Sequence, residues 1–209
     1  MAVRAGDLEV WTATVDQTRP ELVYSERLDT AFGEIRGRIG WGGPGLVYFA
    51  VPRGSRSVIL GVSEDGASAT IVESAANPAP SPDGRYLAYT SLAAGSELST
   101  EVIDLETMQV TCRGLPWGTC VWSPDSRLLA VQQVERIDVF SVPSGAAAAT
   151  ISPEAAPVLT HFVGSDLVYA EAHLAGDYSH LESIRMRRVT PQAGPAHRRR
   201  GEYRQQCPR

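Results

Sequence analysis

The chain contains no lysine, because all 19 basic side chains among its 209 residues are arginine. A Schiff-base lysine, a P-loop lysine and a lysine general base are therefore excluded, together with the enzyme classes that require them. The sequence also has no G-x-S-x-G nucleophile motif, which excludes an α/β-hydrolase site. The missing lysine and the richness in alanine, glycine and proline indicate a GC-rich bacterial genome.

Long apolar runs and paired cysteines are missing too. No stretch approaches the roughly 20 apolar residues of a membrane span, and the N-terminus carries no apolar leader, so we expect a cytoplasmic protein without membrane contact. Cys112, Cys120 and Cys207 form no C-x-x-C pair, and neither a metal nor a cofactor is expected. The spacing of Cys112 and Cys120 permits a disulfide, but buried, reduced thiols suit a cytoplasmic protein better.

What the sequence does contain is a repeat. Residues 79–91 read APSPDGRYLAYTS, and residues 121–133 read VWSPDSRLLAVQQ. The apolar runs after these turns, and two fainter copies, begin at Leu46, Tyr86, Leu128 and Leu167, at intervals of 40, 42 and 39 residues. A repeat of about 40 residues is typical of β-propeller blades.

The turn in each strong copy has a clear conformation. Its proline fixes φ, its aspartate can accept hydrogen bonds from nearby amides, and Gly84 tolerates a positive φ. In the second copy Ser126 replaces this glycine, so we expect that turn to differ or to be strained.

Each apolar run is followed by further segments typical of β-strands. These are residues 57–65, 68–74, 99–107, 109–114, 136–142 and 147–152. An apolar residue, mostly aromatic, precedes each turn: Trp41, Pro80, Trp122 and Phe162. It lies on the innermost strand, where we expect it to wedge between neighbouring sheets. Each repeat therefore predicts four strands.

The terminal repeats are incomplete. Residues 7–37 predict a unit without its innermost strand, in which AFGEIRG supplies the last strand, and the final unit lacks an outer strand. We therefore predict an all-β fold, a β-propeller of about five four-stranded blades, whose two ends complete each other or leave a gap.

The segments SPDGRYLAYTS and WSPDSRLLAV resemble the repeat of the TolB family, a WD40-like propeller repeat. The resemblance covers about residues 39–190. It implies a propeller fold and a tendency toward protein contacts, and it implies no active site. We expect a single propeller domain over residues 1–190 and a basic, disordered tail over 191–209.

Charge is distributed unevenly. Residues 185–209 hold eight arginines against Glu202 alone, a net of +7, whereas the rest of the chain holds 11 arginines against 23 acidic residues, a net of −12. The tail could bind an acidic partner or nucleic acid, dock onto the acidic body, or remain solvated. Because the acidic body would repel phosphate, nucleic-acid binding is not expected.

Two places could support chemistry. The last unit contains Glu171, His173, Asp177, His180 and Glu182 around a hairpin, where a metal or acid–base site would require them to converge; the alternative is a solvated loop. His161 precedes Phe162 on the innermost strand, near the expected axis. It is either a catalytic candidate or a core or channel residue.

Two functions follow. The first is a non-catalytic scaffold that binds a protein or peptide through one propeller face, with Trp11, Trp117 and Tyr178 as candidate anchors. The alternative is a small bacterial biosynthetic enzyme of the lyase or cyclase type, or a small-molecule-binding protein, that uses the axial pocket near His161.

Overall fold

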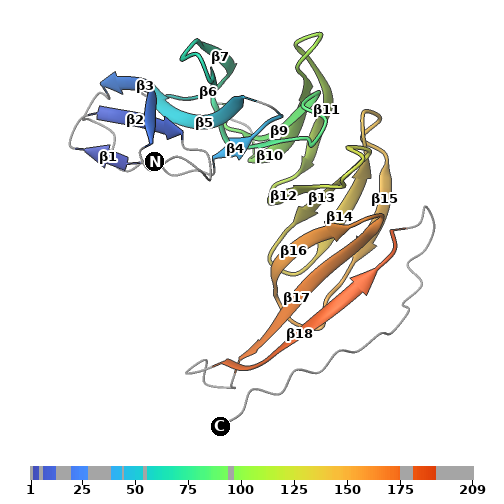
Figure 1. Cartoon of the computed structure of the whole chain (residues 1–209). Coiled ribbons are helices and arrows are strands. Elements are labelled where there is room, and N and C mark those ends of the chain that lie inside the picture. Colours follow the sequence, from blue (N-terminus) through green and yellow to red (C-terminus); the bar gives the residue numbers. More distant parts are fainter. Residues whose placement is uncertain are drawn as a thin grey trace. The chain divides into compact units, whose positions relative to one another are not determined.

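The computed structural model describes residues 2–4, 7–12, 20–27, 39–43, 45–53, 56–93, 97–174 and 181–191. Within these ranges all regular secondary structure is β-strand, and the strands form five sheets (Figure 1). The prediction of an all-β chain built from five repeated units is confirmed.

The strands follow one another through the sheets in chain order. The first sheet contains β1 (Ala2–Arg4), β2 (Asp7–Thr12) and β3 (Glu21–Arg27). The second contains β4 (Gly40–Trp41), β5 (Leu46–Arg53), β6 (Arg56–Ser63) and β7 (Ser68–Glu73). The third contains β8 (Ala75–Pro80), β9 (Tyr86–Ser91), β10 (Ser99–Asp104) and β11 (Gln109–Pro116). The fourth contains β12 (Thr119–Trp122), β13 (Leu128–Gln132), β14 (Ile137–Ser141) and β15 (Ala147–Ile151), and the fifth β16 (Pro157–Val163), β17 (Asp166–Leu174) and β18 (Leu181–Val189).

The repeats that the sequence predicts to be complete each form a four-stranded sheet. The second, third and fourth sheets have four strands each, and the first and fifth have three described strands. One prediction at the N-terminus is wrong, because β1 pairs with β2 where no strand was expected before Asp7. The strand expected at AFGEIRG lies outside the described residues, and the closure of the chain ends stays a prediction.

Strands inside the sheets are buried on both faces. In β14 the residues Ile137, Asp138, Val139 and Phe140 are all buried, although Asp138 is charged. Sheets that are covered on both sides bury both sets of side chains of a central strand. The sequence of residues 136–142 therefore predicts the strand correctly but does not say which of its residues reach solvent.

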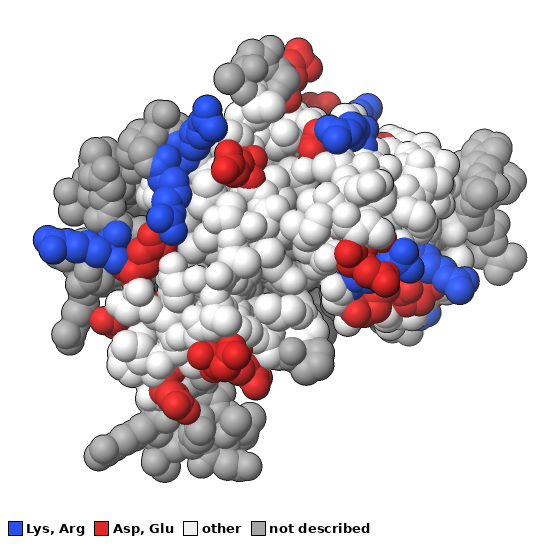
Figure 2. Space-filling model, turned by 90° about the horizontal axis from the view of Figure 1, so that it is seen from above, with Lys and Arg blue, Asp and Glu red and all other residues white. Residues whose placement is uncertain are grey.

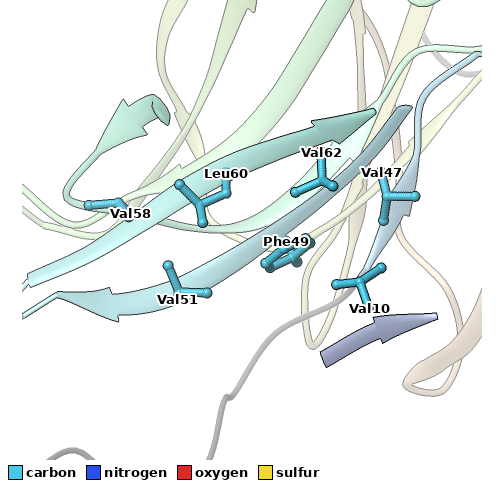
Figure 3. Packing of buried hydrophobic residues seen from close by; sticks show 7 residues of the cluster. All are labelled: Val10, Val47, Phe49, Val51, Val58, Leu60 and Val62. Carbon is cyan, nitrogen blue, oxygen red and sulfur yellow. The ribbon is translucent and has the colours of Figure 1, made fainter. Parts of the chain in front are cut away.

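Two compact units can be distinguished by their contacts: residues 1–80 with 89–98, and residues 81–88 with 99–209. In the first unit Val10 of β2 packs on an apolar cluster from β5 and β6 that surrounds Phe49 and Leu60 (Figure 3). The ring of Tyr24 on β3 lies 6.0 Å from that of Phe49. Fully burying an apolar side chain such as Phe49 contributes about 1.5–3 kcal/mol to stability, so this cluster joins the first sheet to the second.

The second unit has a core of the same kind. Phe162 and Leu167 of the fifth sheet are buried with Ile137 and Val139 of the fourth. Trp122 stacks on Tyr86, with ring centroids 6.2 Å apart. The wedge role predicted for Trp122 and Phe162 is confirmed.

Trp41 does not follow this pattern, because its side chain is 60% exposed. A Cβ added to Gly40 would lie 2.3 Å from Pro80 Cδ, and one added to Gly42 would lie 3.0 Å from Pro80 Cβ. The two glycines therefore face Pro80, and the residue between them points to the other side of the strand. The core position predicted for Trp41 is wrong.

The Ser-Pro-Asp turns are organised by their serines. The Oγ of Ser81 donates to Asp83 (2.6 Å) and accepts from the Tyr86 amide (2.8 Å). The Oγ of Ser123 makes the same two bonds, with Asp125 (2.6 Å) and the Leu128 amide (2.9 Å). Both serines are buried, so each turn contains a satisfied internal network.

Ser126 adopts the glycine conformation of its turn, with φ at 60°, close to the 74° of Gly84. Its Oγ accepts a hydrogen bond from the backbone amide of Asp83, at 3.1 Å. The strain expected for a left-handed serine is therefore present, and the side chain links the two repeated turns.

Candidate functional site

The hairpin candidates are only partly described. Glu171 and His173 lie on β17, while Asp177 and His180 lie outside the described residues. Glu182 lies on β18. Whether all five converge stays a prediction, and the described residues hold no group of three or more His, Cys, Asp or Glu arranged to bind a metal ion.

Glu171 is a buried carboxylate, with an exposed side-chain fraction of 1%. Its Oε1 accepts the backbone amide of Glu154 at 3.0 Å, and its Oε2 accepts Arg187 Nε of β18 at 3.2 Å. Arg187 also contacts Glu154 Oε2 at 3.4 Å. Both carboxylate oxygens are therefore bonded, and the group joins β17, β18 and the segment before β16.

His173 lies beside this ion pair without joining it. Its Nε2 is 3.7 Å from Glu171 Oε2, which exceeds hydrogen-bonding distance, and this buried nitrogen has no hydrogen-bond partner among the described residues. The side chain is 23% exposed. Whether His173 acts as a general base stays a prediction.

His161 does not converge with His173. It lies on β16 opposite Val168, whereas Glu171 and His173 lie at odd-numbered positions of β17, on the other face of the sheet. His161 is exposed, so it is not a core residue. The alternative function near the axis stays a prediction.

Sequence reasoning missed Arg187 and Glu154, the partners of Glu171. The proximity of Arg187 to Glu171 follows only from the register of β17 and β18. This register places Arg185 opposite Glu171 and Arg187 opposite Tyr169, so all four side chains lie on one face of the sheet. The interval across the hairpin does not reveal this register, so the sequence could not pair the charges.

The two described cysteines are free thiols. Cys112 is buried, donates to the carbonyl oxygen of Pro143 at 3.4 Å, and burial raises the pKa of its thiol. Cys120 is partly buried and adjoins Thr100. A raised pKa keeps the Cys112 thiol protonated and unreactive at neutral pH.

The described residues also expose an apolar pair at one end of the fourth sheet. Trp117 precedes β12 and is 52% exposed, and Val134, in the β13–β14 turn, is 76% exposed. Thr119 pairs with Gln132 at the end of the β12–β13 ladder, and Trp117 and Val134 each lie two residues beyond this end, before β12 and after β13. We call Trp117 and Val134 the loop-end pair.

Local backbone geometry holds the loop-end pair in place. A Cβ on Gly118 would lie 2.3 Å from the carbonyl oxygen of Gln132, so only glycine permits this close approach. Gln132 in turn donates to the Pro157 carbonyl at 2.7 Å, which ties this end to β16. Exposed Glu135 and Arg136 adjoin Val134 along the chain and provide polar neighbours.

Of the other candidate anchors, Trp11 is exposed and Tyr178 lies outside the described residues.

No protein-family model matches the sequence, and no curated protein matches it. Among solved structures, the β-propeller domain of the trilobed protease from Pyrococcus furiosus is similar, with a TM-score of 0.60 and 17% identity over 72% of this chain and 52% of that one. TolB from Acinetobacter baumannii is similar with a TM-score of 0.59 and 15% identity, over 88% of this chain and 46% of that one. A chain of a nidogen–laminin complex gives 0.54 and 14%, over 84% and 71%.

The chain thus spans about half the length of the protease propeller domain and of TolB. At these identities the likeness concerns the path of the backbone and assigns no activity. Together with the five sheets in chain order, it shows that the chain has a TolB-like β-propeller fold.

Proposed function

We propose that the chain is a non-catalytic β-propeller scaffold that binds a protein or peptide through the loop-end pair. The observation that carries this proposal is the exposure of Trp117 and Val134 at the same end of the fourth sheet, with the charged residues Glu135 and Arg136 following Val134 along the chain. Tryptophan is enriched in the hot spots of protein interfaces, where apolar side chains are combined with polar groups at the rim. The structural likeness to a propeller from a nidogen–laminin complex supports a role in protein contacts.

The charge distribution supports a protein partner over nucleic acid. Figure 2 shows one elongated run of basic side chains and several separate groups of acidic side chains, with broad uncharged surface between them. Residues 1–184 carry 11 arginines against 23 acidic residues, a net charge of −12, which repels phosphate backbones. The described residues include no helix that is long and apolar enough to cross a membrane. Free thiols at Cys112 and Cys120 support a cytoplasmic location, which cell fractionation would test.

The test begins with selection of peptides from a display library on the full chain. Binding of the selected peptides is then measured by fluorescence anisotropy to the wild type, to Trp117→Ala and to Trp41→Ala. Trp41 is the matched control, since it is an exposed tryptophan on another sheet. We expect Trp117→Ala to weaken binding by about tenfold or more, and Trp41→Ala to leave it unchanged. Failure to select any peptide, or equal binding by Trp117→Ala, would overturn the proposal.

A further inference from the structure

The β13–β14 turn holds one member of the loop-end pair in a tight hairpin. The amide of Gln133 donates to the carbonyl oxygen of Arg136 at 2.8 Å, so Val134 and Glu135 are the two central residues of the loop. Both of these residues are exposed. A two-residue hairpin loop has little conformational freedom, and a surface that is already ordered loses little entropy when it binds a partner. Val134 and Glu135 are therefore held in a fixed arrangement at the surface.

The two charged residues of this turn differ in their partners. Arg136 Nε lies 2.9 Å from Oδ2 of Asp138, which is buried. The carboxylate of Asp138 also accepts hydrogen bonds from Gln133 and Thr150, each at 2.7 Å, so it is fixed in place and neutralises Arg136 within the turn. Glu135, in contrast, makes no hydrogen bond or ion pair with another described residue. The charge that this turn offers to a partner is therefore the negative charge of Glu135.

Charge on the rest of the chain has the same sign. Residues 1–184 carry a net charge of −12, which attracts cationic partners over a longer range and raises the rate at which they are encountered. In the connection that follows the fourth sheet, Glu154 already contacts Arg185 at 3.6 Å and Arg187 at 3.4 Å. Its carboxylate is thus compensated internally, whereas that of Glu135 is open to an external cation.

One short peptide can contact both members of the loop-end pair. Thr119 pairs with Gln132, and Trp117 and Val134 each lie two residues beyond this pair. Paired Cα atoms of antiparallel strands lie about 4.5–5.5 Å apart and successive Cα atoms about 3.8 Å apart, so the Cα atoms of Trp117 and Val134 are at most about 21 Å apart. An extended peptide of about seven residues spans this distance.

We propose that the partner segment is a short, extended peptide that carries arginine or lysine beside an apolar anchor. The apolar anchor packs on Trp117 and Val134, and the cation pairs with Glu135. The face of a tryptophan ring also attracts cations, so the exposed ring of Trp117 favours the same partner charge. An acidic segment would be repelled by Glu135 and by the net charge of the chain. This inference rests on the proposed function and adds the chemical class of the partner.

Sequences selected from a random heptapeptide display library on the full chain give the first test. We expect arginine and lysine to be enriched near an apolar residue, and aspartate and glutamate to be depleted, relative to the starting library. Selected peptides that bind through Trp117 without this enrichment would overturn the inference and leave the proposed function in place. If no peptide is selected, both fail. Self-association of the full chain that Trp117→Ala abolishes, measured by sedimentation velocity, would assign the loop-end pair to a second copy and also overturn the inference.

The second test compares a selected arginine peptide with the same peptide carrying citrulline, which keeps the shape of the side chain and removes its charge. In fluorescence anisotropy at low salt, we expect citrulline to weaken binding to the wild type by about threefold, the size of effect typical of an exposed ion pair. This difference should disappear on Glu135→Gln and shrink in 1 M salt. Glu64→Gln is the matched control, because Glu64 is an exposed glutamate in the β6–β7 turn, and it should retain the difference. An equal effect of citrulline on the wild type and on Glu135→Gln would refute the pairing of the cation with Glu135.

Discussion

At the scale of single residues, the serine that opens each Ser-Pro-Asp turn bonds both the aspartate of the turn and the first backbone amide of the next strand. Sequence reasoning assigned the turn to proline, aspartate and glycine, whose conformational preferences are local. The contribution of Ser81 and Ser123 depends on their burial, which a local pattern does not show. The recurrence of serine before Pro-Asp in both copies was the available signal, since serine hydroxyls commonly bond backbone amides in turns.

We predict that Ser81→Ala lowers the free energy of unfolding by about 1–3 kcal/mol, because the Tyr86 amide and Asp83 lose their buried partner. Chemical denaturation measures this loss. Ser165→Ala is the control: Ser165 is exposed in the tight β16–β17 turn, and its replacement should change stability by less than about 0.5 kcal/mol. Equal effects of the two substitutions would contradict the role of Ser81.

Ser126 provides a second residue-scale prediction, because it combines strain with a useful hydrogen bond. Ser126→Ala loses the bond from the Asp83 amide and keeps the left-handed backbone, whereas Ser126→Gly loses the same bond and relieves the strain. We expect Ser126→Ala to be less stable than Ser126→Gly by about 1 kcal/mol in urea unfolding.

Gly84→Ala measures the strain alone. A Cβ at Gly84 would meet no heavy atom within 4 Å, so the left-handed φ is the only obstacle. Its cost should also be about 1 kcal/mol. If Gly84→Ala is neutral, the strain argument for Ser126 fails.

At the scale of strands, periodicity in the sequence predicts which segments form β-structure but not their neighbours. The twelve strands expected in the three complete repeats are present, because turn chemistry and apolar runs are local signals. Trp41 was misplaced because its burial depends on which side of β4 faces Pro80. Glu171 was correctly selected as a notable residue, but its partners lie on another strand, and the register that joins them is a tertiary property.

The pair of Glu171 and Arg187 gives the element-scale prediction. Arg187→Met leaves a buried carboxylate without its cation, so we expect a loss of about 3 kcal/mol in the free energy of unfolding. Arg185→Met is the matched control on the same strand face, since Arg185 contacts Glu154 where both side chains are largely accessible, and its loss should be within about 1 kcal/mol. Similar losses for both variants would show that Arg187 is not needed to neutralise Glu171.

At the scale of the whole molecule, several aspartates share one electrostatic feature. Hydrogen bonds from the Ser123 hydroxyl and the Arg127 amide hold the pKa of Asp125 below its usual 3.8. Partial burial alone would raise the pKa of Asp83, but bonds from Ser81 and the Arg85 amide lower it. At Asp166, bonds from Thr190 and Arg188 also lower the pKa. These three aspartates lie in turns or at strand ends of different repeats. The same local hydrogen bonding therefore lowers a carboxyl pKa at several places in the molecule.

The pH dependence of stability follows from these lowered pKa values. A carboxyl whose pKa is lower in the folded state binds fewer protons there than in the unfolded state, so its stabilising contribution is complete above the unfolded pKa and disappears as pH falls through the folded one. We therefore expect the free energy of unfolding to be level above a pH of about 5 and to fall below about 4. Urea unfolding across this range, repeated with Asp83→Asn combined with Asp125→Asn, should show a shallower decline than the wild type. Exposed Glu64→Gln serves as the control, and an unchanged decline in the double variant would exclude the turn aspartates as its source.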